Sequence, residues 1–156
     1  MNTFKFGIAT IDDLPYIVKL KLAMFFESGH FALLAANAED VILNDYRHLY
    51  TSDKARHFVT RVDGCVVAMA GAFIKSDLPY RYFKSSTYGF IGDVYTKPSF
   101  RNRGVATRLN KAALRWLKTQ NVEMVRLLAS DTGRPLYKKL GFVPTDEMVL
   151  LLEQSR

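Results

Sequence analysis

The most constraining feature of this sequence is a strand, a turn and a helix that follow one another directly between residues 88 and 117. The run TYGFIGDVYT has the aromatic and β-branched content of a strand, and after Pro98 apolar side chains recur every three to four residues, as on one face of a helix. A further buried strand, VEMVRLLA, is predicted at residues 122–129. Two strands joined by such a helix predict a parallel β-α-β crossover of the usual right-handed form.

The segments before this crossover predict strands and two helices. Asp63 and Gly64 stand between two runs rich in β-branched residues, which is a strong signal for a hairpin within residues 56–74. A short strand is predicted at residues 4–9, and apolar periodicity predicts helices over residues 14–25 and 37–49.

The segments after the crossover predict one more helix and the end of the sheet. Residues 131–140 form a short helix in this prediction, closed by Gly141 at a position typical of a C-cap. Residues 142–153, FVPTDEMVLLLE, are predicted to form one or two strands. The whole order indicates a mixed α/β sheet with helices packed on it.

Length and composition fit one globular domain, residues 1–156. Of the 156 residues, 49% are hydrophobic and 24% are charged, and a chain of this size can bury roughly 70% of its unfolded surface. The longest clean apolar run, CVVAMAGAFI, is about half as long as a membrane span requires, and the N-terminus lacks the pattern of a signal peptide. The single cysteine, Cys65, cannot form an internal disulfide. We therefore expect a cytoplasmic protein without a membrane segment.

The excess positive charge is confined to one segment. Residues 97–139 hold eleven Lys and Arg against two acidic residues, whereas residues 1–96 hold ten of each sign. A local net charge of +9 predicts an anionic partner, either a nucleic acid or a small polyphosphate.

The turn RNRGVA, residues 101–106, has the properties of an anion site. A helix N-terminus exposes unpaired N–H groups and carries partial positive charge, so phosphates bind there. Gly104 and Ala106 have almost no side chain and allow a diphosphate to approach the backbone, while Arg101 and Arg103 can add charge-assisted hydrogen bonds. The turn is neither a P-loop nor a dinucleotide fingerprint. A solvated basic helix start is the alternative for the arginines alone.

Two motifs in this order resemble those of the GNAT superfamily of acyl-CoA-dependent N-acyltransferases. In that family a strand ending in a V-x-P-like turn precedes [RQ]-x-x-G-x-[GA], and here VYTKPSF leads into residues 101–106. The family's LYxxLGF element appears as residues 136–142, within LLASDTGRPLYKKLGF. The resemblance implies a single GNAT-like domain with a mostly antiparallel sheet of six to seven strands, about four helices, and the parallel crossover at the cofactor site.

The resemblance also implies the co-substrate, acetyl-CoA, and the residues that would hold it, with no metal. The turn at residues 101–106 would wrap the pyrophosphate, and the Thr107 hydroxyl that follows it would contact the same group. The preceding strand would pair through its main chain with the pantetheine arm. Which basic residue meets the 3′-phosphate stays open among Arg108, Lys111, Arg134, Lys138 and Lys139. The implied cofactor-binding residues are Val94, Tyr95, Thr96, Arg101, Asn102, Arg103, Gly104, Val105, Ala106 and Thr107.

Two residues are candidates for catalysis. In the family the tyrosine of LYxxLGF protonates the departing thiolate, and Tyr137 matches it; a phenol with a pKa of about 10 is protonated at neutral pH. Asp93 interrupts an otherwise apolar strand, where a carboxylate is costly to bury unless it is paired. We expect Asp93 to anchor the acceptor amine or to act as general base; a structural acid is the alternative. The three histidines lack metal-ligand spacing and are expected in surface or structural roles.

The acceptor is expected to be a primary amine of a small molecule or peptide, and the resemblance implies that its specificity lies in the first two helices and the loop at residues 75–86. In that loop Pro79, Tyr80, Tyr82 and Phe83 could wall the acceptor site or merely cover the sheet. Two other functions compete with acetyl transfer: an acyl-CoA-binding sensor or assembly subunit without turnover, and a basic nucleic-acid-binding module. The small residues of the turn fit close phosphate approach better than base stacking, which disfavours nucleic acid. A homodimer is possible, since the apolar tail MVLLLE could pair across subunits or complete the sheet.

Overall fold

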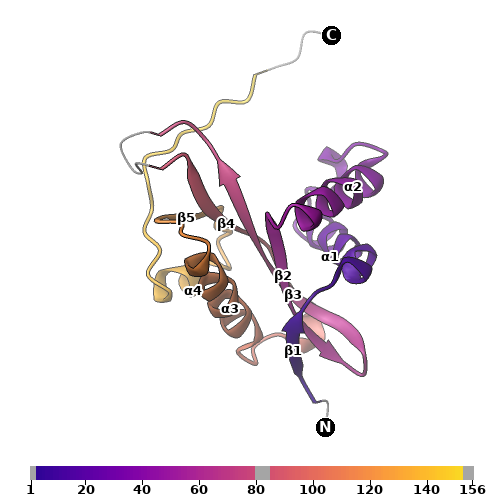
Figure 1. The fold of residues 1–156 in the computed structure, drawn as a ribbon. Helices are drawn as coiled ribbons and strands as arrows, with labels where there is room; N and C mark the ends of the chain where they lie inside the picture. The colour runs from indigo at the N-terminus through magenta and orange to yellow at the C-terminus, as the bar shows by residue number, and fades with distance from the viewer. Residues whose placement is uncertain (1–2, 80–84, 153–156) are drawn as a thin grey trace.

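The computed structural model describes residues 3–79 and 85–152 of the chain (Figure 1). The five strands are β1 (Lys5–Ile8), β2 (Ala55–Val62), β3 (Cys65–Ser76), β4 (Thr87–Thr96) and β5 (Val125–Leu127). The four α-helices are α1 (Leu14–Glu27), α2 (Ala38–Thr51), α3 (Val105–Thr119) and α4 (Arg134–Lys139). Short 3₁₀ turns η1 (Ile11–Asp13), η2 (Phe31–Leu33) and η3 (Pro98–Phe100) connect them.

The strands form one mixed sheet in the order β1-β2-β3-β4-β5. Neighbouring strands are antiparallel from β1 to β4, and β5 pairs parallel to β4. The predicted hairpin at Asp63 and Gly64 and the predicted β4-α3-β5 crossover are therefore both confirmed.

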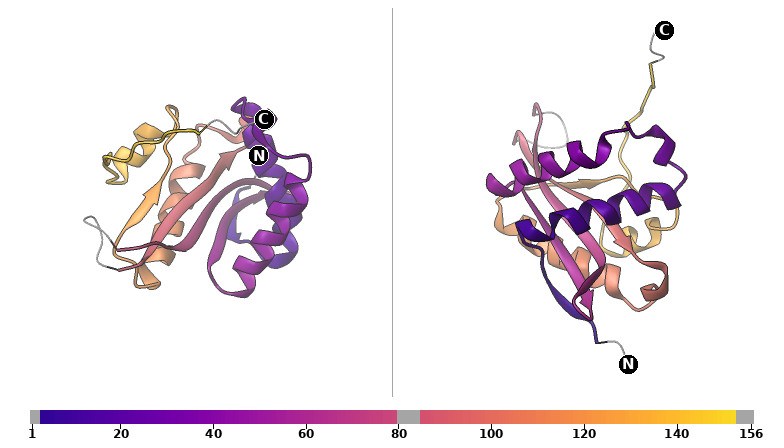
Figure 2. Two further views of the ribbon diagram at one scale, coloured as in Figure 1. Left: turned by 90° about the horizontal axis from the view of Figure 1, so that it is seen from above. Right: turned by 90° about the vertical axis from the view of Figure 1, so that its right-hand side faces the viewer.

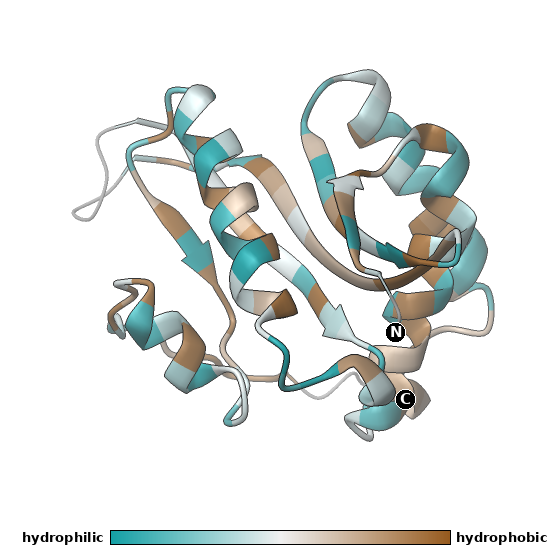
Figure 3. Cartoon of the chain, turned by 90° about the horizontal axis from the view of Figure 1, so that it is seen from below, coloured by the Kyte–Doolittle hydropathy of each residue, from teal (hydrophilic) through white to brown (hydrophobic). Residues whose placement is uncertain are grey.

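Helices cover both faces of this sheet (Figure 2). One core holds apolar residues of α1 and α2 against Val59, Met69 and Phe73, and the other packs α3 against the opposite face. The apolar residues of α3 recur every three to four positions, so its surface shows both hydrophobic and hydrophilic patches in Figure 3. Among the described residues, no helix is long and apolar enough to cross a membrane.

The sheet has five strands in the described part of the chain, rather than the six to seven expected. Residues 142–152 run without strand pairing, and β5 is shorter than the predicted 122–129. An apolar run makes a strand only where a neighbouring strand offers hydrogen-bond partners. The run from Met148 to Leu152 has no such neighbour, and its side chains are 78–94% exposed.

Two irregularities of β4 shape the region after its midpoint. Met69 lies opposite Tyr95 but Gly71 lies opposite Gly92, so β4 has one residue more than β3 between these pairs. This bulge contains Asp93, whose φ of 53° is left-handed. On its other edge β4 pairs with β5 only from Gly89 to Ile91. Within the described ranges, the rest of that edge, residues 92–96, is left without a neighbouring strand.

Candidate active site

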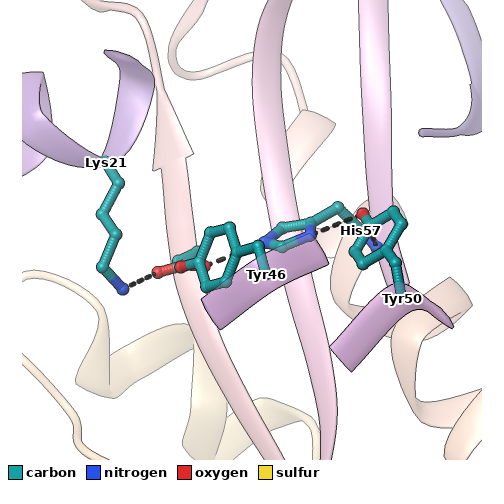
Figure 4. Close-up of polar contacts among 5 residues, drawn as sticks. Lys21, Tyr46, Tyr50 and His57 are labelled. Atoms are coloured by element: carbon teal, nitrogen blue, oxygen red, sulfur yellow. Dashed lines mark hydrogen bonds and ion pairs between the residues drawn. The ribbon is translucent and has the colours of Figure 1, made fainter. Parts of the chain in front are cut away.

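Asp93 is the centre of a buried polar network beneath α1 and α2 (Figure 4). Its Oδ1 accepts a hydrogen bond from Lys21 Nζ of α1 at 2.5 Å. Its Oδ2 accepts hydrogen bonds from Tyr46 of α2 and, at 2.8 Å, from His57 Nε2 of β2. The Asp93 side chain is 2% exposed and that of Lys21 is 21% exposed. Three donors from three elements therefore compensate the buried carboxylate.

The donors around Asp93 outweigh the effect of its burial. Burial by itself raises the pKa of a carboxyl group, but the hydrogen bonds and charges of His57 and Lys21 hold the pKa of Asp93 well below its usual range. Burial and the adjacent carboxylate in turn raise the pKa of Tyr46 far above its ordinary value. Asp93 is thus an ionised group at neutral pH and a poor proton acceptor.

His57 extends the network to a second tyrosine. The Tyr50 hydroxyl lies 2.7 Å from His57 Nδ1 and also accepts a hydrogen bond from the His57 backbone N–H at 3.1 Å. These partners fix the orientation of the imidazole, so that its Nε2–H group faces Asp93 and its Nδ1 faces the Tyr50 hydroxyl. A surface or structural role was predicted for His57 from the sequence, and its contact with Asp93 was not predicted. The sequence held a signal for its burial, because His57 lies two residues from both Ala55 and Val59 in β2 and so shares their core-facing side of the strand.

The turn between β4 and α3 has the open backbone expected of an anion site. Asn102 and Gly104 both have left-handed φ values, 60° and 73°, and a Cβ placed on Gly104 would meet nothing within 4 Å. The first helical hydrogen bond of α3 runs from the N–H of Arg108 to the carbonyl of Gly104. The N–H groups of residues 105–107 therefore have no partner inside the helix.

Arg101 makes contacts that the sequence did not predict. Its guanidinium lies 2.6 Å from Glu27 Oε1 at the end of α1, and its Nε donates to the Thr96 carbonyl at 2.8 Å. The Tyr95 hydroxyl donates to Glu27 Oε2 at 2.9 Å. The hydrogen bonds from Arg101 and Tyr95 lower the pKa of Glu27. Glu27 thus joins the end of α1 to the turn.

The other arginines of the turn lie beside the first strand. The Arg103 guanidinium is 5.8 Å from the ring centre of Phe4, and that of Arg108 is 3.7 Å from the ring centre of Phe6. These cation–π contacts place Arg103 and Arg108 near β1, whereas Arg101 points to α1. The three arginines consequently surround the turn from two sides.

Tyr137 lies in α4, where its ring packs edge-on against Phe142 at 6.0 Å. The residue is 8% exposed, and burial raises the pKa of its hydroxyl. That hydroxyl has no hydrogen bond among the described residues, yet it is not sealed from solvent. No hydrogen bond, ion pair or ring contact within the described residues joins Tyr137 to Asp93, so the structure does not bring the two predicted catalytic residues into contact.

An open pocket adjoins the end of β4. Its walls are mostly apolar and come from α1, η2 and the segment 95–98; they are Leu22, Ala23, Phe26, Glu27, Phe31, Tyr95 and Pro98. Tyr80, Tyr82 and Phe83, considered either as a wall of the acceptor site or as a cover of the sheet, lie outside the described residues. Over residues 3–79 and 85–152, no group of three or more His, Cys, Asp or Glu side chains could hold a metal ion.

The edge of β4 is unpaired beyond the midpoint of the strand, and the strand leads into a left-handed turn at the N-terminus of a helix. Together these two features define a class of protein that binds an elongated, phosphate-bearing co-substrate. Residues 21–142 match the model of the acetyltransferase (GNAT) family. The chain belongs to this family, and it is an N-acetyltransferase with acetyl-CoA as its co-substrate. The expected superfamily, fold class and co-substrate are confirmed.

Known proteins similar to this chain are acetyltransferases. An aminoglycoside N(6′)-acetyltransferase type 1 of Salmonella typhimurium is 29% identical over 123 residues, covering 75% of this chain and 82% of that protein. A GCN5-related N-acetyltransferase of Ralstonia eutropha has a TM-score of 0.87 and 26% identity, covering 96% of this chain and 99% of that one. A Clostridium acetobutylicum protein described as a predicted acetyltransferase, crystallised with acetyl-CoA, has a TM-score of 0.86 and 23% identity, covering 96% of both chains.

Proposed function

We propose that this enzyme transfers the acetyl group of acetyl-CoA to a primary amine on a small molecule. The open edge of β4 at residues 92–96, continuous with the turn at Gly104, is the observation that carries the proposal. The pantetheine arm would pair with Val94, Tyr95 and Thr96 as an added strand, and the pyrophosphate would meet the unpaired N–H groups at the start of α3. The similarity to an aminoglycoside acetyltransferase supports a small-molecule acceptor.

Direct transfer requires few groups from the protein. The free amine attacks the thioester carbonyl, an N–C bond forms, and the C–S bond of the tetrahedral intermediate breaks. Tyr137 gives its phenolic proton to the departing thiolate, the proton released by the amine passes to solvent, and solvent returns a proton to the Tyr137 phenolate. The raised pKa of Tyr137 keeps the phenol protonated at neutral pH, as this role requires.

For Asp93 we propose a positioning role instead of proton abstraction. Its pKa lies below the usual range and its oxygens already accept from Lys21, Tyr46 and His57, so it has little capacity to take a further proton. It would fix the Lys21 ammonium at the border of the cleft and hold the bulge of β4 in its left-handed conformation. The amine would then be deprotonated by water or enter as the free base.

Thiol release from acetyl-CoA across a panel of amines tests the proposed function. The panel should include a polyamine, an aminoglycoside, amino acids and a peptide. We expect thiol release that depends on at least one amine and disappears in Gly104→Glu, which places a carboxylate where the pyrophosphate would bind. Amine-independent hydrolysis alone, or unchanged acetyl-CoA affinity in Gly104→Glu measured by calorimetry, would overturn the assignment.

A further inference from the structure

Four side chains form a cationic floor on the sheet face that carries α1 and α2: Lys75 of β3, Tyr88 and Phe90 of β4, and Arg126 of β5. The register places them together, because Lys75 is opposite Tyr88 and Phe90 is opposite Arg126. Paired residues point to the same side of a sheet, as do residues two apart in a strand. Phe90 packs on the α1 and α2 core, which identifies the face.

The two cations of the floor rest on its two aromatic rings. Lys75 Nζ lies 3.8 Å from the ring centre of Phe90, and the Arg126 guanidinium lies 5.0 Å from that of Tyr88. Such contacts hold the charged groups over the floor while leaving their outer sides accessible. Arg126 also makes an ion pair at 3.2 Å with Glu147, whose side chain is 54% exposed.

The Lys75 ammonium is the unneutralised charge of this region. Nowhere in residues 3–79 and 85–152 does a carboxylate form an ion pair with it, although its side chain is exposed. Partial burial lowers the pKa of Lys75, and the nearby charges of Lys21 and Arg126 lower it further. The register of β3, β4 and β5 places Lys75 and Arg126 on the same floor, and a bound anion would relieve the repulsion between them.

The floor lies along β4 from the buried network around Asp93. Phe90 precedes Asp93 by three residues, which corresponds to about 10 Å of strand. Two acidic groups near the floor are already paired with cations, Asp93 with Lys21 and Glu147 with Arg126. An acceptor with several ammonium groups would find cations here instead of acidic partners.

We propose that the cationic floor binds a carboxylate carried by the acceptor, so that the substrate is an amino acid or another small amine with a carboxylate at its far end. Lys75 is the main contact and Arg126 the second. This inference rests on the proposed function and specifies its substrate class. It differs from what the similarity to an aminoglycoside acetyltransferase alone would suggest, because aminoglycosides carry several amines and no carboxylate.

Matched acceptors test the proposal in the full-length enzyme. We would measure kcat/KM for ω-amino acids of five and six carbons, for the corresponding ω-amino amides, and for an aminoglycoside. We expect the carboxylates to exceed the amides by about tenfold, the effect of one charged hydrogen bond. Equal rates for acid and amide, or a preference for the aminoglycoside, would overturn the proposal.

Variants assign the effect to the floor. Lys75→Met keeps an apolar stem over Phe90 and should remove most of the preference for the carboxylate, since only Arg126 remains, without changing kcat/KM for the amide or KM for acetyl-CoA. Glu147→Gln frees Arg126 and should lower KM for the carboxylate acceptors by about twofold. Lys5→Met removes an exposed charge from β1 at the opposite edge of the sheet. It should change neither the preference for the carboxylate nor KM for the carboxylate acceptors. Equal loss on both acceptors in Lys75→Met would refute the assignment.

A binding readout separates this inference from the proposed function. If no amine releases thiol, the proposed function fails, and thermal unfolding with the acetylated products still examines the floor. N-acetyl-6-aminohexanoate should raise Tm more than its amide does, and Lys75→Met should remove that difference. Equal Tm shifts for the two products would count against the floor whatever the enzyme acetylates.

Discussion

The Arg101 guanidinium lies 2.6 Å from Oε1 of Glu27, so the end of α1 is tied to the turn that precedes α3. The same arginine is expected to meet the pyrophosphate, and Glu27 therefore competes with the co-substrate. Both side chains are about 40% exposed, with values of 38% and 42%, and such pairs contribute about 0–1 kcal/mol.

Glu27→Gln should consequently lower KM for acetyl-CoA by about two- to threefold, because Arg101 is released. Arg101→Ala should raise the same constant. Glu39→Gln serves as the control, because it removes a carboxylate from the exposed first turn of α2. It should leave KM for acetyl-CoA unchanged. Steady-state kinetics at low and high salt would check this; an increase of KM in Glu27→Gln would show that Glu27 orders Arg101 for binding instead of competing.

Gly104 gives a second prediction that concerns backbone conformation alone. Its φ is 73°, and a Cβ there would meet no atom within 4 Å, so a substitution is penalised only by the left-handed conformation. Gly104→Val should reduce the free energy of unfolding by about 1–2 kcal/mol, whereas Gly104→Asn should lose less because asparagine tolerates this region. Urea denaturation would measure both. Equal losses would mean that side-chain crowding, and not φ, sets the cost.

Much of the fold was predictable because its signals are local. The hairpin at Asp63 and Gly64 and the amphipathic α3 each depend on neighbouring residues, and both are confirmed. The bulge at Asp93 was not predicted, since a bulge depends on the register between β3 and β4. Residues 142–152 show the opposite error: their local pattern favours a strand, but pairing requires a partner that the described part of the chain does not supply.

The site was predictable only in part for the same reason. Asp93 was singled out because a carboxylate within an apolar strand needs partners, yet none of those partners could be named from the sequence. Lys21, Tyr46 and His57 come from three elements separated by 36 to 72 residues from Asp93. Contacts of this length follow from packing, which no motif or spacing records.

Asp93→Asn should preserve the bulge, because asparagine also adopts left-handed φ values. It should still reduce stability by about 3 kcal/mol at pH 7, since the Lys21 charge and the buried His57 lose their partner. The pKa of Asp93 is lowered by folding, so its stabilising effect is present above the unfolded carboxyl pKa and is lost as the pH falls through the folded value. The wild type should therefore lose stability below about pH 4, and Asp93→Asn should lack that part of the acid dependence. Parallel acid-titration slopes for the two proteins would contradict the ionised state of Asp93.

Tyr137→Phe should lower kcat by about 100-fold while changing KM for acetyl-CoA little, because a general acid acts on the leaving group and not on binding. Burial raises the pKa of Tyr137, so kcat of the wild type should show no loss from tyrosine ionisation below about pH 10. Tyr16→Phe, at a position 61% exposed on α1, is the control and should be neutral. An unchanged kcat in Tyr137→Phe would remove Tyr137 from the catalytic step and favour proton supply from water.

The tail from Met148 to Leu152 gives the last prediction, which concerns assembly. Five consecutive apolar side chains there are 78–94% exposed, an unfavourable arrangement for a chain that remains alone in water. The neighbouring sheet edge, β5, has three residues. We expect a second copy of the chain to cover this run, with strand pairing across the interface.

Light scattering at micromolar concentration should give the mass of a dimer, and the double variant Leu150→Lys, Leu152→Lys should give a monomer. Val143→Lys, at an exposed position outside the run, is the matched control and should stay dimeric. A wild-type monomer would refute the expected pairing of this run across subunits.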